Sequence, residues 1–125
     1  MEYDLDMRLE GDVLLVCLTG TRTRETVIAA SRDIMEAWSQ SSTTKHLIDV
    51  RRFPGRLHLA DDYEVPAKEF AGLPYRDRLK ASAVVDLAAN HARFVLFEDV
   101  ARSRGFNLRV FSDIDRAWKW LDEQG

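Results

Sequence analysis

The sequence predicts an α/β fold, in which a four- to five-stranded mixed, mainly parallel sheet begins with an N-terminal β-hairpin and is covered by about four helices. Residues 3–9 alternate between apolar and polar side chains, and after a turn at Gly11 residues 13–18 are almost continuously apolar. The first pattern is typical of a half-buried edge strand, and the second of a strand buried on both faces. From residue 21 onward helical and strand patterns alternate, which favours parallel strands joined by helices.

The first helix is expected to follow a threonine cap and to end near Ser39. The hydroxyl of Thr21 or of Thr23 can accept a hydrogen bond from a backbone N–H at the helix start. Apolar side chains then recur at three- and four-residue spacing: Val27, Ala30, Ile34 and Trp38. A polar loop leads to the central strand, residues 46–50, where His46 is expected to be half-exposed.

The next helix is predicted over residues 63–71 and should start close to Pro66, because a helix tolerates proline only in its first turn. A buried strand follows over residues 81–87. It leads into a long helix from His91 to Arg104, with Asn90 as its cap and Gly105 just past its end.

The last strand is predicted over residues 108–111. Ser112 is expected to cap the final helix, whose buried stripe is Ile114, Ala117, Trp118 and Leu121.

The overall composition fits one domain spanning residues 1–125 with a net charge of −3. Interspersed acids and bases argue against a nucleic-acid partner, which usually needs a basic stripe. The single cysteine, Cys17, excludes an intrachain disulfide, and its apolar neighbours predict a buried core residue. The N-terminus lacks the apolar stretch of a signal peptide, and no segment is long enough to span a membrane, so we expect a cytoplasmic protein.

Known catalytic and cofactor motifs are missing from the sequence. It contains no glycine-rich phosphate loop, no HExxH and no GxSxG pattern. The histidines His46, His58 and His91 are far apart, and their spacing predicts no metal site. We therefore expect no metal, no cofactor and no enzymatic activity, and an enzyme built on Asp49 and its neighbouring arginines is the least favoured hypothesis.

A candidate ligand-binding region follows the central strand, because ligands of α/β sheets bind beyond the carboxyl ends of the strands. Three arginines within six residues could hold an anion such as a phosphate or a carboxylate. The competing interpretation is structural: the aspartate accepts loop hydrogen bonds or pairs with an arginine, and the arginines pair with nearby acids. The candidate residues are Asp49, Arg51, Arg52, Phe53, Arg56, Phe70 and Tyr75.

A candidate interface lies on the long helix, which is apolar around most of one turn although a helix on a sheet needs only one apolar stripe. Trp120, on the last helix, also lies off its stripe. Packing against an adjacent helix is the simpler explanation of these positions, and a patch on a contact surface is the alternative. The candidate interface residues are Phe94, Val95, Leu96 and Trp120.

The chain combines the N-terminal hairpin with three telling stretches: LIDVR, ASAVVD and RVFSDIDRAWKWL. This pattern resembles that of the SpoIIAA-like (STAS-like) small bacterial proteins. The resemblance implies this fold and a non-enzymatic regulatory role. Relatives include anti-sigma factor antagonists that are switched by phosphorylation of a serine following the central strand. Here no serine or threonine occurs between Lys45 and Lys80, so this switch is not expected.

The leading hypothesis is therefore a regulatory or protein-interaction domain without the phosphorylatable serine, which forms a homodimer or binds another protein. The alternative is a binding protein for a small apolar or anionic, lipid-like ligand. The shared sheet-and-helix design of the lipid-binding CRAL-TRIO domains supports this alternative as a resemblance.

Overall fold

A computed structural model describes residues 2–125 and contains one five-stranded sheet with the order β1-β2-β3-β4-β5. β1 (Tyr3–Glu10) pairs antiparallel with β2 (Val13–Gly20). β3 (Lys45–Arg52), β4 (Ala81–Val85) and β5 (Leu108–Phe111) then follow in parallel. The predicted mixed, mainly parallel sheet with an N-terminal hairpin is confirmed.

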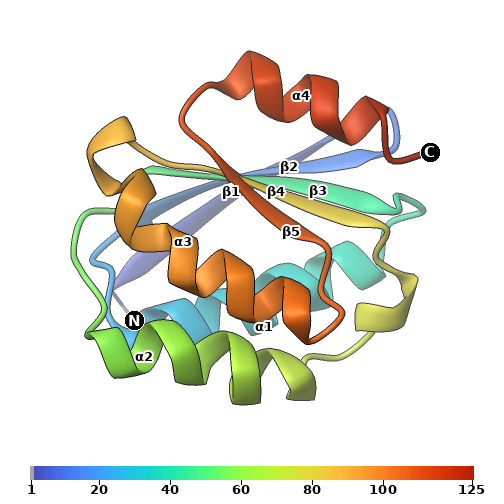
Figure 1. Cartoon of the computed structure of the whole chain (residues 1–125). Helices are drawn as coiled ribbons and strands as arrows, with labels where there is room; N and C mark the ends of the chain where they lie inside the picture. The colour runs from blue at the N-terminus through green and yellow to red at the C-terminus, as the bar shows by residue number, and fades with distance from the viewer. Residues whose placement is uncertain (1) are drawn as a thin grey trace.

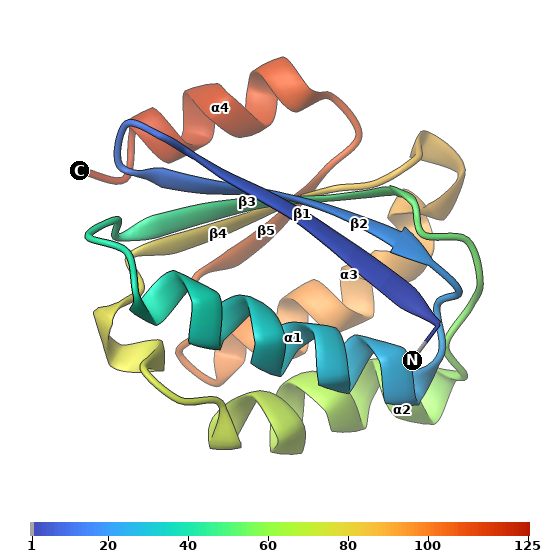
Figure 2. The same cartoon turned by 180° about the vertical axis from the view of Figure 1, so that it is seen from behind.

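The helices cover the two faces of the sheet unequally. α4 (Ile114–Asp122) lies on one face, and α1 (Arg24–Ser39), α2 (Leu59–Glu64) and α3 (Ala88–Ser103) lie on the other, as Figures 1 and 2 show from opposite sides. Short helical segments η1 (Val65–Glu69), η2 (Phe70–Gly72) and η3 (Arg76–Arg78) connect α2 to β4. The sheet thus separates a large apolar cluster, under α1 and α3, from a smaller one around Leu47, Trp120 and Leu121.

Helix caps account for most differences from the expected helix boundaries. Thr23 caps α1 as expected, and Gly105 follows α3 with φ of +82°. Asn90 was expected to cap α3, but the helix begins at Ala88 and Asn90 instead donates a hydrogen bond to Asp86. Ser112 was expected to cap α4, but Asp113 caps it by accepting from the Asp115 N–H.

Pro66 does not start a helix, contrary to the expectation. α2 begins at Leu59, and the chain continues through Pro66 as a π-helical turn over Val65–Glu69. In this wider turn the Phe70 N–H bonds to the Val65 carbonyl, five residues back. The turn gives the proline ring room inside a helical stretch, because the ladder of four-residue bonds is interrupted where proline has no N–H to offer.

Three expectations about burial were wrong. Cys17 is exposed, because it faces the side of the sheet that α4 leaves uncovered near β1 and β2. His46 is buried at 2% exposure, because α1 packs over this end of β3. Trp120 is buried against Phe111, so it does not add to an exposed patch.

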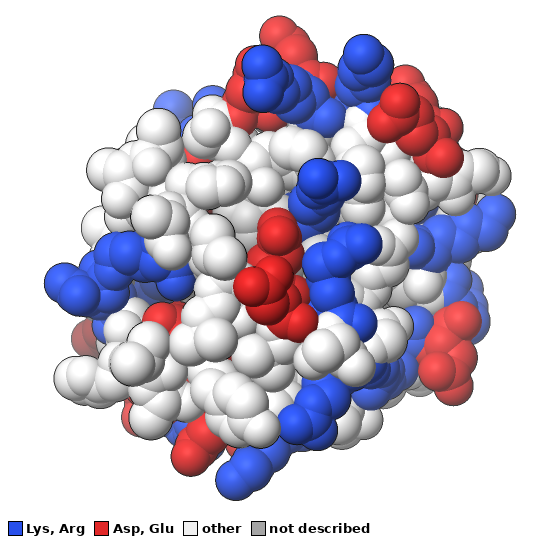
Figure 3. Space-filling view, in the orientation of Figure 1, with Lys and Arg blue, Asp and Glu red and all other residues white. Residues whose placement is uncertain are grey.

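The surface carries mixed charge. Figure 3 shows basic and acidic side chains beside each other, and a wide uncharged area on the side where α2 and α3 begin. Within residues 2–125, no helix is long and apolar enough to cross a membrane.

Candidate functional site

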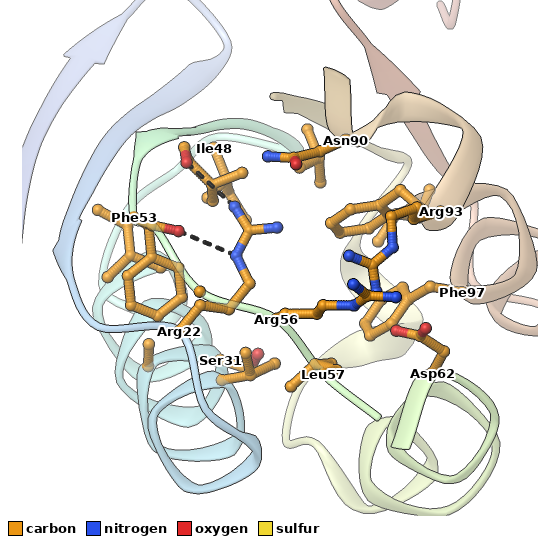
Figure 4. Close-up of a pocket in the computed structure, with 18 of the residues that line it drawn as sticks. Arg22, Ser31, Ile48, Phe53, Arg56, Leu57, Asp62, Asn90, Arg93 and Phe97 are labelled. Atoms are coloured by element: carbon orange, nitrogen blue, oxygen red, sulfur yellow. Dashed lines mark hydrogen bonds between the residues drawn. The ribbon is translucent and has the colours of Figure 1, made fainter. Parts of the chain in front are cut away.

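An apolar cavity of about 100 Å³ lies between the sheet and helices α1, α2 and α3. Its floor comes from alternate residues of the parallel strands, because successive strand residues point to opposite faces of a sheet. The helices supply the walls, and a few polar side chains stand at the mouth (Figure 4). The apolar lining includes Leu18, Val27, Ile34, Ile48, Val50, Phe53, Leu57, Phe70, Val84, Phe94, Phe97 and Leu108.

Arg22 forms one side of the mouth and is held by the loop that follows β3. Its backbone N–H bonds to the Pro54 carbonyl at 2.7 Å, and it forms a parallel bridge with Gly55. Gly55 has φ of +128°, and a Cβ at this position would lie 2.5 Å from the Arg22 carbonyl oxygen. Only glycine therefore allows the two loops to approach this closely.

The Arg22 guanidinium is buried at 8% exposure and is bonded on three sides. Its Nε donates to the Phe53 carbonyl at 3.0 Å, and one terminal nitrogen donates to the Val50 carbonyl at 3.1 Å. The other terminal nitrogen donates to Asp86 at 2.9 Å. The rings of Phe53 and Phe94 lie 5.5 and 5.8 Å from its central carbon, within range of cation–π attraction.

Asp86 ends β4 and is buried at 1% exposure. Its second oxygen accepts from the Leu87 N–H at 2.8 Å and from the Asn90 amide at 3.1 Å. A buried ion pair is tolerated only when its remaining hydrogen-bonding atoms are satisfied, and this one meets that condition on the carboxylate side. The pair fixes Arg22 as part of the cavity wall.

Arg56 and Arg93 stand across the mouth from Arg22. Their guanidinium groups lie together beside Asp62 in Figure 4. Neither arginine forms an ion pair with any residue among 2–125. Because the Arg22–Asp86 charges cancel, the two arginines and Asp62 leave the mouth with a net positive charge.

Asp62 is the acidic group of the mouth. Burial, followed by repulsion from Asp61, raises the pKa of the Asp62 carboxyl, and the charges of Arg22 and Arg56 act against this rise. Burial therefore outweighs the attraction of the two arginines in setting the direction of this shift.

A smaller chamber of about 30 Å³ adjoins the cavity, and five residues line both: Ser31, Ile34, Ile48, Phe70 and Leu108. Its wall includes His46 and Ser82, whose Nδ1 and Oγ lie 2.9 Å apart. Burial lowers the pKa of His46 to about 4, so the imidazole is neutral at physiological pH. A base this weak, with no acid bonded to its Nε2, does not activate Ser82 as a nucleophile.

The predicted ligand-binding residues divide into two groups. Phe53, Arg56 and Phe70 line the cavity. Asp49 faces the opposite side of the sheet, where it accepts two hydrogen bonds from the Arg51 side chain, at 2.7 and 3.0 Å. These bonds and the nearby arginine charges outweigh burial and lower the pKa of Asp49. Arg52 and Tyr75 are exposed and do not line the cavity.

The predicted interface residues also separate. Phe94 lines the cavity, Val95 is exposed at 42%, Leu96 is half-buried and Trp120 is buried. Sequence reasoning missed Arg22, Asn90 and Arg93 as mouth residues. Asn90 had been predicted as a helix cap, and nothing in the sequence pairs Asp86 with an arginine 64 positions away.

Other reactive groups do not form a second site. Although Cys17 is exposed, partial desolvation of its thiol, reinforced by the charges of Asp49 and Asp6, raises the thiol pKa and leaves it mainly protonated. Within residues 2–125, no group of three or more His, Cys, Asp or Glu side chains is placed to hold a metal ion.

No protein-family model and no curated protein matches the chain, whereas solved structures do. An anti-sigma factor antagonist from Mycobacterium paratuberculosis superposes with a TM-score of 0.62 at 14% identity, over 96% of this chain and 94% of that one. An uncharacterized protein with a SpoIIAA-like fold from Shewanella loihica superposes with a TM-score of 0.58 at 17% identity, over 96% and 94%. The chain therefore has the SpoIIAA-like fold.

Proposed function

We propose that this protein is a non-enzymatic binding domain whose cavity takes a small molecule with an apolar body and one anionic group. The observation that carries the proposal is the apolar cavity with Arg56 and Arg93, which form no ion pair among residues 2–125, at its mouth. Sequence reasoning ranked this function second, behind protein interaction. The apolar cavity is the observation that supports placing it first here.

The size and lining of the cavity define the ligand class. A space of about 100 Å³ suits a short alkyl chain or a single ring, since an engineered cavity of about 150 Å³ holds benzene. The aromatic and aliphatic wall favours an apolar body. An arginine beside the opening provides charge-assisted hydrogen bonds to a carboxylate or a phosphate ester.

Calorimetric titration with 3-phenylpropionate tests the proposal. We expect saturable binding that weakens about tenfold in Arg56→Ala and in Arg93→Ala, because each change removes a charged donor. Arg52→Ala is the matched control: it removes an arginine of the same loop region that does not line the cavity. Equal loss of affinity in all three variants, or no binding to the wild type, would count against the proposal.

A second candidate is a regulatory protein-interaction domain, including a homodimer. The similar structure of an anti-sigma factor antagonist favours it, as do exposed apolar side chains on α2 and around α3: Leu59 at 74%, Tyr63, Leu87 and Val95. This candidate does not include a serine switch after the central strand, since no serine or threonine occurs between Lys45 and Lys80.

Light scattering at increasing concentration tests the homodimer. We expect a mass above that of one chain for the wild type and for Val95→Ile, and a single-chain mass for Val95→Glu, because a buried charge disfavours association. A wild type that stays at one chain throughout would rule out self-association as the role of this surface.

A further inference from the structure

The floor of the cavity is polar at both ends and apolar between them. On β3 the residues facing the cavity side are His46, Ile48 and Val50. On β4 they are Ser82 and Val84, and Asp86 follows directly after the strand. The His46–Ser82 pair closes one end, and the Asp86–Arg22 pair closes the other. The aliphatic side chains of Ile48 and Val84 lie between the two polar pairs and line the cavity.

The inner end has an unsatisfied polar atom. His46 is buried at 2% exposure and lines the smaller chamber. Its Nδ1 is bonded to Ser82, but its Nε2 has no hydrogen-bond partner among residues 2–125. A buried imidazole nitrogen without a partner is costly, so a group that bonds to it gains free energy that an apolar group does not.

We infer, on the basis of the proposed function, that the ligand carries a second, uncharged hydrogen-bonding group at the end opposite its anion, and that this group bonds to His46. The chamber and the cavity share five lining residues, so His46 lies in a chamber that directly adjoins the inner end of the cavity. His46 and Val50 are four positions apart on β3, so roughly 13 Å of strand separates the two ends of the cavity floor.

A hydroxyl is the group that fits best. Whether Nε2 donates or accepts depends on the tautomer that Ser82 selects, and a hydroxyl can do either. A second charged group does not fit, because the chamber is apolar and the imidazole facing it is neutral. The ligand class is therefore a hydroxylated aromatic or short-chain acid.

The experiment compares 3-phenylpropionate with 3-(4-hydroxyphenyl)propionate on the full chain. We expect the hydroxylated acid to bind the wild type roughly 3- to 10-fold more tightly, the gain typical of one buried hydrogen bond. In His46→Leu we expect the order to reverse by about fivefold or more, because the hydroxyl is then buried without a partner. The ¹⁵N resonance of His46 Nε2 in the wild type should move with the hydroxylated acid only.

The outcomes separate this inference from the proposed function. If both acids bind equally, or the parent acid binds more tightly, the hydroxyl has no partner and the inference is overturned while the cavity remains a binding site. If neither acid binds, both proposals are overturned. The wild-type comparison and the Nε2 resonance decide the matter even if His46→Leu does not fold.

Discussion

Arg22 joins the loop after β2, in which it lies, to the end of β3, to the loop after β3 and to the segment between β4 and α3. Its three side-chain hydrogen bonds reach Phe53, Val50 and Asp86. Both charges of the Arg22–Asp86 pair are buried. If one partner is removed, water cannot reach the remaining charge to take its place. The pair therefore acts on stability and on the shape of the cavity mouth together.

Arg22→Met is expected to lower the free energy of unfolding by about 3–5 kcal/mol, because it leaves the Asp86 charge buried and without a cation. Urea unfolding followed by circular dichroism measures the change. Arg51→Met is the control, because the Arg51 side chain of the Arg51–Asp49 pair is 39% exposed, and we expect it to cost about 1 kcal/mol or less. Similar losses in both variants would contradict the role given to burial.

His46 makes stability depend on pH between about 4 and 6.5. The unfolded chain binds this proton with a pKa of 6.5 and the folded chain with a pKa of about 4, so the unfolded state binds more protons in this range. Stability should therefore fall as the pH falls through it, by up to about 3 kcal/mol at the lower limit. Urea unfolding at several pH values should show this slope in the wild type and lose it in His46→Gln.

At the scale of elements, the connection from β3 to α2 sets the mouth of the cavity. Phe53 and Leu57 turn inward from it, Arg56 stands at the mouth, and Gly55 bonds with the Arg22 loop. This connection holds no regular structure of its own until α2 begins at Leu59. Its conformation depends on the close approach at Gly55.

Gly55→Ala should therefore destabilise the fold by about 2 kcal/mol or more, since alanine disfavours φ of +128° and its Cβ would collide with the Arg22 carbonyl. Thermal unfolding gives the measurement. Gly72→Ala is the matched control: it has no atom within 4 Å of a new Cβ and no positive φ, so we expect a change near zero. A Gly55→Ala protein as stable as Gly72→Ala would disprove the close approach.

The elements also show what sequence reasoning can reach. The order of strands and helices follows from local periodicity, which is why the hairpin, the parallel strands and the Thr23 cap were predicted correctly. Helix starts were harder to predict. Pro66 lies inside a helical stretch because a π-helical turn accommodates it, and Asn90 does not cap α3 because its amide bonds to Asp86. Both depend on contacts that no short sequence window contains.

At the scale of the whole molecule, the sheet assigns the candidate residues to two separate surfaces. Asp49 and Arg51 lie on β3 on either side of Val50, but they face the other side of the sheet, where they pair with each other. The cavity instead collects Arg22, Arg56 and Arg93 from three segments far apart in the chain. The alternation of residues between the two faces of β3 can be predicted from the sequence. The proximity of the three arginines cannot, because it depends on how α3 packs against the β3–α2 connection.

The central claim is that the space between the sheet and helices α1–α3 binds a small amphipathic anion. Methyl-resolved NMR during titration with 3-phenylpropionate tests it most directly, because cavity methyls and control methyls are observed in one sample. The cavity methyls are those of Val27, Ile34, Ile48, Val50 and Val84, and the controls on the opposite face are those of Val13, Leu15 and Leu47. We predict saturable shifts of the cavity methyls with the controls unmoved. No saturable shift, or shifts confined to the face under α4, would contradict the claim.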